Sequence, residues 1–170
     1  MRVPVSPAAL GGGLVVVICA IAGVLYIQRG AKIELTGAVL KVRTLPLDET
    51  SSLAVADFRF VNPSNYPFVV QEVIVSMQDK SGKIVEGSTV SALDTGHLFE
   101  NYPILGPKYN DALIVRNKIP SRQSWDRMIA ARFEVPVTEL DARRKLIIRI
   151  VDVDGPASEL EEAATPPAKR

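Results

Sequence analysis

The amino-acid sequence predicts a mainly β protein, an antiparallel two-sheet β-sandwich preceded by one N-terminal transmembrane helix. Three observations lead to this prediction. An uncharged run of twenty residues extends from Ala8 to Ile27. About seven short segments between Thr36 and Gly155 have the residue pattern of strands, and turn residues recur between them. Short strands at this spacing are typical of β-sandwiches.

The N-terminal run has the length and composition of a membrane span. A helix of about twenty residues is about 30 Å long, which matches the hydrocarbon core of a bilayer. Two alternatives compete with this interpretation: Ala20-Ile21-Ala22 has the form of a signal-peptide cleavage site, and Cys19 could mark a lipoprotein signal. The residues after Ala22 are apolar where a cleavage region is polar, and the bulky Ile18 precedes Cys19. An uncleaved anchor is therefore predicted.

The chain divides into five predicted segments. Residues 1–7 form a short N-terminal tail, 8–28 the transmembrane helix, 29–35 a juxtamembrane linker, 36–155 the β-sandwich domain and 156–170 a disordered tail. The C-terminal tail is rich in Pro, Ala and Glu and shows no periodicity, as is typical of disorder. The single cysteine, Cys19, lies in the predicted span, so an intramolecular disulfide is impossible.

Alternation of apolar and polar residues predicts the strands. The clearest strand, Leu53 to Val61, places Ala54, Ala56, Phe58 and Phe60 on one face and Asp57 and Arg59 on the other. The other expected strands are Thr36–Arg43, Phe68–Met77, Ile84–Val90, Ala112–Val115, Met128–Val135 and Leu146–Val153. In three of them period two predicts the apolar face: Val69, Val73, Val75 and Met77; Ile129, Ala131, Phe133 and Val135; and Leu146, Ile148 and Ile150. Helical signals are few: the capping-box form of Thr138-Glu139-Leu140-Asp141 predicts a helical turn between Pro136 and Arg144, and Ser91 to Tyr102 is ambiguous.

A turn with two prolines joins two of these strands. Asn62 suits the first position of a type I turn and Pro63 the second, where the fixed φ of proline is already correct. Pro67 lacks an N–H group and therefore belongs at the start of a strand or on an edge. Proline between Asn62 and Ser64 excludes N-glycosylation, so the turn is interpreted as architecture.

An apolar strand, an Asn-Pro turn, a second strand, another turn and a short segment ending in glycine resemble the WHy domain of late-embryogenesis-abundant type-2 proteins. The matching parts are Leu53–Val61, Asn62-Pro63, Phe68–Met77, Ser81–Lys83 and Ile84–Gly87, so the resemblance covers about residues 53–87. It implies an Ig-like, fibronectin-III-like antiparallel β-sandwich and an association with stress protection. Residues from Leu98 to Trp125 depart from the family pattern.

The charge distribution bears on orientation and partners. Arg29 and Lys32 follow the span and favour a cytoplasmic domain, whereas a short tail carrying Arg2 resembles a signal anchor that exports the domain. With the resemblance, an extracytoplasmic (periplasmic) domain is preferred. Twenty basic and nineteen acidic residues give a net charge of +1, without the basic field of a nucleic-acid binder. The one dense basic cluster, Arg143-Arg144-Lys145, is interpreted as a solvated helix cap.

The sequence contains no recognisable catalytic or metal-binding set. His97 is the only histidine, and a nucleophile activated by a base or a zinc site needs more partners than it offers. Asp152 and Asp154 lack the further oxygen ligands of a calcium loop and are expected to be solvated. A glycine-rich phosphate loop is also missing. We therefore predict no enzyme activity, no cofactor and no metal.

A loop rich in aromatic and aliphatic residues is the candidate partner-binding region. Leu98 to Tyr109 gathers such residues outside any strand period, and aromatic residues on loops are frequent interface anchors. The candidate binding residues are Phe99, Tyr102, Leu105, Tyr109 and Trp125. The competing and preferred interpretation is a plug that covers the open end of the sandwich and buries Phe99, Leu105 and Tyr109.

These observations predict a non-catalytic, single-pass membrane-anchored β-sandwich protein with a binding or structural role at the bacterial cell envelope. The expected partners are membrane lipid, through the N-terminal helix, and another envelope protein; nucleic acid is not expected. The alternative is a WHy-type stress-protective or ligand-holding domain.

Overall fold

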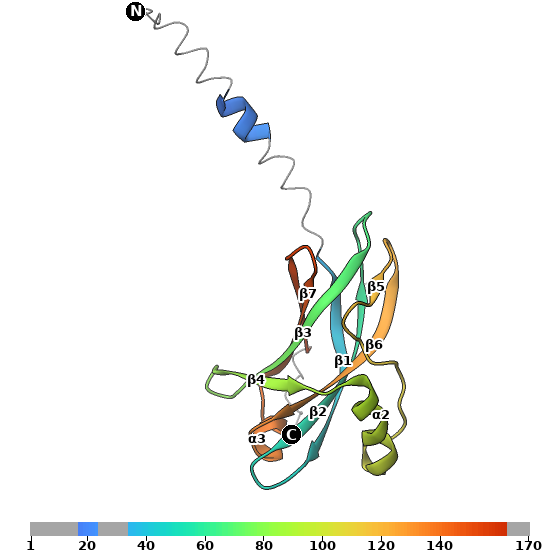
Figure 1. The fold of residues 1–170 in the computed structure, drawn as a ribbon. Coiled ribbons are helices and arrows are strands. Elements are labelled where there is room, and N and C mark those ends of the chain that lie inside the picture. The colour runs from blue at the N-terminus through green and yellow to red at the C-terminus, as the bar shows by residue number, and fades with distance from the viewer. Residues whose placement is uncertain (1–16, 24–33, 163–170) are drawn as a thin grey trace, which may run out of the picture. The chain divides into compact units, whose positions relative to one another are not determined.

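The computed structural model of the chain describes residues 17–23 and 34–162. The chain divides into two compact units, Met1–Lys32 and Ile33–Arg170. In the first unit, residues 17–23 are helical (Figure 1). The remainder of the predicted span 8–28 lies outside the described residues, and among those that are described no helix has the length and apolar character needed to cross a membrane.

The second unit is mainly antiparallel β, as predicted (Figure 1). Its elements in chain order are β1 (Thr36–Pro46), β2 (Ser52–Val61), β3 (Phe68–Gln78), β4 (Ile84–Thr89), α2 (Ala92–Asn101), the 3-10 helix η1 (Pro103–Leu105), β5 (Lys118–Ile119), β6 (Ser124–Phe133), α3 (Val137–Asp141), β7 (Lys145–Asp152) and β8 (Ala157–Glu161). The strands follow the order β1-β2-β6-β4-β3-β7-β8, and β5 pairs with the start of β3.

The two ends of this strand order approach each other. Val39 in β1 forms a parallel bridge with Glu162, just after β8. The N–H of Leu35 also donates to Ser158 Oγ at 2.7 Å. The sheet therefore nearly closes on itself, which leaves little free edge for pairing with other chains.

The short strand β4 joins the two halves of the sheet. Its first residues pair with β3, from Gln78↔Ile84 to Val75↔Gly87. Its last two residues, Ser88 and Thr89, pair instead with Arg132 and Ala131 of β6. One strand thus connects β1–β2–β6 with β3–β7–β8.

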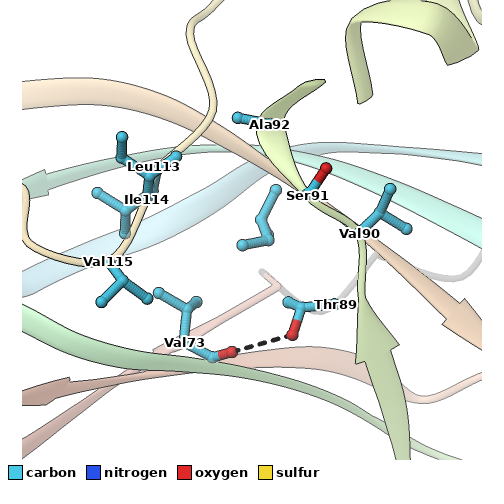
Figure 2. Close-up of a pocket in the computed structure, with 9 residues that line it drawn as sticks. Val73, Thr89, Val90, Ser91, Ala92, Leu113, Ile114 and Val115 are labelled. Atoms are coloured by element: carbon cyan, nitrogen blue, oxygen red, sulfur yellow. Dashed lines mark hydrogen bonds between the residues drawn. The ribbon is translucent and has the colours of Figure 1, made fainter. Parts of the chain in front are cut away.

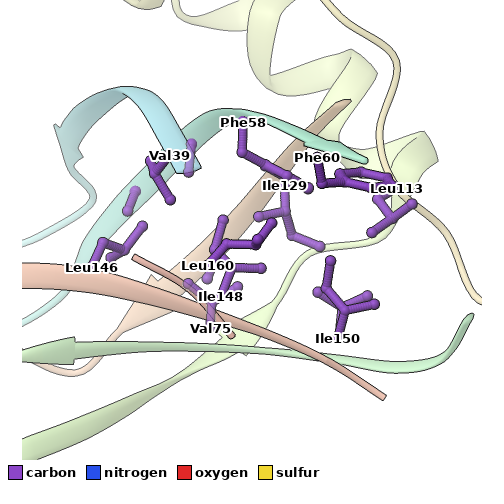
Figure 3. Packing of buried hydrophobic residues seen from close by; sticks show 14 of the residues in the cluster. Val39, Phe58, Phe60, Val75, Leu113, Ile129, Leu146, Ile148, Ile150 and Leu160 are labelled. Carbon is purple, nitrogen blue, oxygen red and sulfur yellow. The ribbon is translucent and has the colours of Figure 1, made fainter. Parts of the chain in front are cut away.

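The main core lies between these halves (Figure 3). The predicted inward faces are confirmed for β2, β6 and β7, whose buried residues include Ala54, Ala56, Phe58, Phe60, Ile129, Ala131, Phe133, Leu146, Ile148 and Ile150. In β3 the predicted period is broken by a bulge between Val70 and Glu72. Phe68 and Val70 therefore point inward before the bulge, and Val73, Val75 and Met77 after it. Both buried clusters consist of residues from the second unit, so this unit has its own core and folds independently.

The Asn62-Pro63 turn is organised by a fully buried asparagine side chain. Asn62 Oδ1 accepts from the N–H and the hydroxyl of Ser64, at 3.1 and 2.8 Å. Its Nδ2 donates to the carbonyl oxygens of Tyr66, Ile119 and Pro120. The turn after β2 is therefore bonded directly to the connection between β5 and β6.

Several sequence predictions need correction. Ala112–Val115 is not a strand; only Ala112 forms a bridge, to Met128. The helical turn after Pro136 is present as α3, but no side chain caps it, so the predicted role of Thr138 is wrong. Ser91–Tyr102 is helical, with the Ser91 hydroxyl accepting from the N–H of Asp94 as the N-cap.

The predicted disordered tail is wrong for residues 157–161, which form β8; residues 163–170 lie outside the described part. Ser158 and Leu160 are buried against the sheet, an alternation too short to stand out among Ala and Glu. The basic cluster caps the helix in part, since Arg143 Nη1 donates to the carbonyl oxygen of Leu140 in α3 at 2.9 Å, but Arg143 is not solvated as predicted. Arg143 makes a two-bond ion pair with Glu162 at 2.9 and 2.7 Å, and Lys145 pairs with Glu161. These pairs fasten the C-terminal strand.

Replacing Gly87 with Ala is expected to destabilise the domain. A Cβ at Gly87 would lie 2.8 Å from the ring of the fully buried Phe133, and overpacking of this kind costs about 1–3 kcal/mol. Gly96→Ala, in α2 with open space around it, should stabilise by about 0.5–1 kcal/mol. Urea unfolding of the two variants measures both changes; equal stability of the two would contradict the packing at Gly87.

Asp48 gives the β1–β2 turn an acid-sensitive contact. The hydroxyl of Ser51 and the N–H of Thr50 donate to its carboxylate and lower its pKa from 3.8 to about 2. Because the folded-state pKa is the lower one, the contribution to stability is full above the ordinary value and is lost as pH falls towards 2. Asp48→Ala should therefore destabilise at about pH 5 and have a shrinking effect towards pH 2, measured by urea midpoints across this range.

Candidate functional site: the α2–η1 lobe and an apolar pocket

A helical lobe covers the outer face of β1, β2 and β6. We call residues 91–110, which contain α2 and η1, the α2–η1 lobe. Leu105 is buried on this face together with Leu45, Leu53, Val55, Met128 and Ala130. Leu98 and Phe99 pack partly against the same cluster. Strand β2 is consequently buried on both faces, from Ser52 to Phe58.

A buried ion pair fixes the lobe to the sheet. Arg43 Nη2 lies 2.6 Å from Asp57 Oδ2, and the two side chains are only 9% and 6% exposed. Arg43 Nη1 donates to the carbonyl oxygens of Leu105 and Pro107, at 2.8 and 2.9 Å. Asn110 Nδ2 donates to the other carboxylate oxygen of Asp57 at 2.9 Å. The Arg43–Asp57 pair thus bonds to residues 105–110 at both ends, through Leu105 and Pro107 at the start and through Asn110 at the end.

The guanidinium group of Arg43 also lies against two aromatic rings, 5.0 Å from the centre of Phe99 and 5.4 Å from that of Tyr109. Cation–π contacts of this kind add to the ion pair. Arg43 Nε is buried without a hydrogen-bond partner within residues 34–162. The site is therefore a structural anchor whose ion pair and hydrogen bonds are made within the domain.

The structure brings four of the five predicted binding residues to the lobe. Leu105 is buried and Phe99 partly buried, as the plug interpretation predicts, but Tyr102 and Tyr109 are exposed. The lobe covers a sheet face, not the open end of a sandwich. Trp125 lies apart on β6, where it packs against the main core and under the guanidinium of Arg127.

The lobe also exposes aliphatic side chains that the sequence analysis did not single out. Leu93 is 73% and Ile104 82% exposed. We call Leu93, Tyr102, Ile104 and Tyr109 the lobe surface. Their exposure could not be read from the sequence, because the same apolar composition supplies the buried Leu105 and Phe99.

An apolar pocket of about 330 Å³ opens beside the start of α2 (Figure 2). Val73, Thr89, Val90, Ser91 and Ala92 line one side, and Leu113, Ile114 and Val115 the other, with Ile129 completing the lining. Sequence reasoning missed this pocket, since it assigned Ala112–Val115 to a strand. A second hollow of about 380 Å³, near Asp79 and Glu139, is more polar.

The titratable residues considered as catalytic or metal-binding candidates lie in different surroundings. His97 is exposed on α2, with Nδ1 3.2 Å from Glu100 Oε2. Asp152, expected to be solvated, is buried, and its Oδ1 accepts from the N–H of Asp154 at 3.1 Å. Residues 17–23 and 34–162 contain no group of three His, Cys, Asp or Glu side chains that could hold a metal ion.

Comparisons with known proteins give no match: no family model matches the chain, and neither the curated proteins nor the solved structures contain a significant relative. The two surfaces are accordingly interpreted from the chain's own residues.

Replacing Arg43 with Met should destabilise the domain by about 3–5 kcal/mol, because it leaves the Asp57 carboxylate buried without its counter-charge. Arg59→Met is the matched control: its pair with Asp126 is 60% and 40% exposed, and exposed pairs contribute less than about 1 kcal/mol. Urea unfolding compares the two variants. Similar losses in both would show that the buried pair does not anchor the lobe.

Proposed function

We propose that the chain is a non-catalytic, single-pass membrane protein whose β-domain binds another protein of the bacterial cell envelope. The observation that carries the proposal is the lobe surface: large apolar side chains are exposed on a segment held by a buried ion pair. Rigidly held aromatic and aliphatic side chains lose little entropy on binding and serve as interface anchors. The uncharged run Ala8–Ile27 supports the membrane anchor.

The proposal includes an extracytoplasmic, periplasmic position for the domain and contact of the N-terminal segment with membrane lipid. The short tail with Arg2 before the apolar run supports this orientation. It also includes the finer fold assignment, an Ig-like or fibronectin-III-like sandwich. In that description β1–β2–β6 and β3–β7–β8 are the two layers, and β4 is the strand that passes from one to the other.

A WHy-type ligand-holding or stress-protective domain is the second candidate. The apolar pocket favours its ligand-holding form, and the Asn62-Pro63 turn belongs to the segment that carries the resemblance. A stress-protective domain should preserve the activity of a labile enzyme through drying better than an equal mass of an inert protein. If the enzyme loses the same activity with this protein as with the inert protein, the stress-protective role is contradicted.

The membrane anchor is tested by fractionation. The full-length protein should stay in the membrane fraction through high-salt and carbonate washes, because a helix of about twenty apolar residues is released only by detergent. Recovery of the protein in the soluble fraction would contradict the anchor.

The lobe surface is tested by photo-crosslinking in cells. A photoreactive amino acid at position 104 should yield a discrete crosslinked species. One at position 84, which is also an exposed isoleucine but lies on β4, should not. Tyr102→Ser should weaken the crosslink from position 104 about tenfold or more, since aromatic anchors dominate interfaces. Tyr66→Ser, at an exposed tyrosine in the Asn62 turn, is the control. Equal crosslinking in all of these proteins would contradict a binding role of the lobe.

A further inference from the structure

The apolar pocket occupies an interruption in the wall of the sheet. On the edge of β3 that faces β4, strand pairing begins at Val75, opposite Gly87. The next main-chain contact on this edge is at Val70, whose oxygen accepts from Arg116 N at 2.7 Å and whose N–H donates to Asn117 O at 3.0 Å. Residues 71–74 of β3 have no neighbouring strand there among the described residues, and the pocket opens at this gap.

Core residues and exposed residues both line the pocket (Figure 2). Val73, Leu113 and Ile129 belong to the main hydrophobic cluster. Ile114 and Val115 are 46% and 56% exposed, although both are large aliphatic residues on a loop. A path lined by apolar side chains therefore leads from solvent to the core.

The two hydroxyl groups in the lining are already engaged. Thr89 Oγ1 donates to Val73 O at 3.5 Å. Ser91 Oγ donates to Asp94 Oδ2 at 2.7 Å and accepts from the N–H of the same residue. The carboxylate of Asp94 also takes the place at the start of α2 that an anionic ligand would need. The pocket thus offers mainly apolar contact, and neither hydroxyl group is free to anchor a polar head group.

We propose that this pocket binds the end of an alkyl chain of a neutral single-chain amphiphile, with the head group left in solvent. A cavity of about 150 Å³ lined by aliphatic residues holds one benzene ring, so a pocket of about 330 Å³ takes a longer group. Its volume lies at the lower end of the range for small-molecule sites, which are mostly apolar. A lining that is buried at Val73, Leu113 and Ile129 and exposed at Ile114 and Val115 suits a chain that enters by its end.

The inference rests on the proposed function only in that the domain binds and does not catalyse; the pocket is lined by none of the four residues of the lobe surface. The two can therefore fail separately. A chain-binding pocket with no crosslink from position 104 would leave the pocket in place and remove the protein partner. A crosslink from position 104 without binding of the chain would contradict the pocket and leave the protein partner in place.

The test uses the unit Ile33–Arg170, the neutral fluorescent probe N-phenyl-1-naphthylamine, and 1-decanol as the competing chain. Wild-type protein should enhance the fluorescence of the probe, and decanol should displace it. Ala92→Trp places a large side chain at the lining, and each buried methylene contributes about fourfold to affinity. If the variant excludes two methylenes of the chain, the Kd for decanol should rise at least about tenfold.

Ile84→Trp is the matched control, because position 84, in β4, is exposed, does not line the pocket and lies outside the lobe surface. It should leave the Kd unchanged within about twofold. Val115→Asp, at an exposed lining residue, gives a second variant that changes no fully buried residue, and it should weaken binding by about tenfold or more. Circular dichroism and urea unfolding confirm that each variant is folded.

Three results would overturn the proposal: no enhancement of probe fluorescence by wild-type protein, enhancement that decanol does not reverse, or equal binding by Ala92→Trp and Ile84→Trp. A separate arm uses phosphatidylcholine vesicles. Sedimentation with vesicles that Val115→Asp abolishes, without displacement by decanol, would replace a free chain with a lipid surface as the occupant.

Discussion

The buried ion pair between Arg43 and Asp57 is the interaction on which the outer layer of the domain depends. Strand β2 lies between β1 and β6 and carries apolar residues on both faces, so its second face needs a cover. The α2–η1 lobe provides this cover, and Arg43 bonds to its main chain at Leu105 and Pro107. Since isolated short helices are only marginally stable in water, the lobe depends on this attachment and on the cluster around Leu105.

The same attachment determines the course of the chain beyond the lobe. Asn110, which bonds to Asp57, is followed by the segment in which Asp111 and Leu113 exchange main-chain hydrogen bonds with Met128 of β6. From there the chain crosses to β3 at Arg116. The side of the pocket formed by Leu113, Ile114 and Val115 is therefore positioned by the same network as the lobe surface. Two candidate binding surfaces with separate linings share one structural support.

Local periodicity was sufficient to predict most of the strands and their buried faces. Phe58 and Phe60 stand two residues apart in β2, and such spacing is decided by the geometry of the strand itself. Asp57 shows the limit of this reasoning. The alternation places Asp57 with Arg59 on the other face from Phe58, yet the lobe, which begins 34 residues later in the sequence, buries it beside Arg43. The bulge at Val70–Glu72 and the strand β8 were missed for a related reason, because pairing with β7 stabilises both. The candidate pocket could not be predicted, since no local pattern marks the place where a strand is missing.

Residues 71–74 of β3 lack a neighbouring strand because of the contacts that hold the segments on the two borders of this gap. On one side, Gly87 lies directly against the Phe133 ring, so β4 approaches β6 closely. The residues after Gly87 therefore pair with β6 and not with β3. On the other side, Asn62 binds the carbonyl oxygens of Ile119 and Pro120, which keeps β5 at the start of β3. Moving either border along β3 would break buried contacts, which favours an arrangement that leaves residues 71–74 without a neighbouring strand. A pocket formed in this way is preorganised, and a ligand that enters it need not pay for ordering the chain around it.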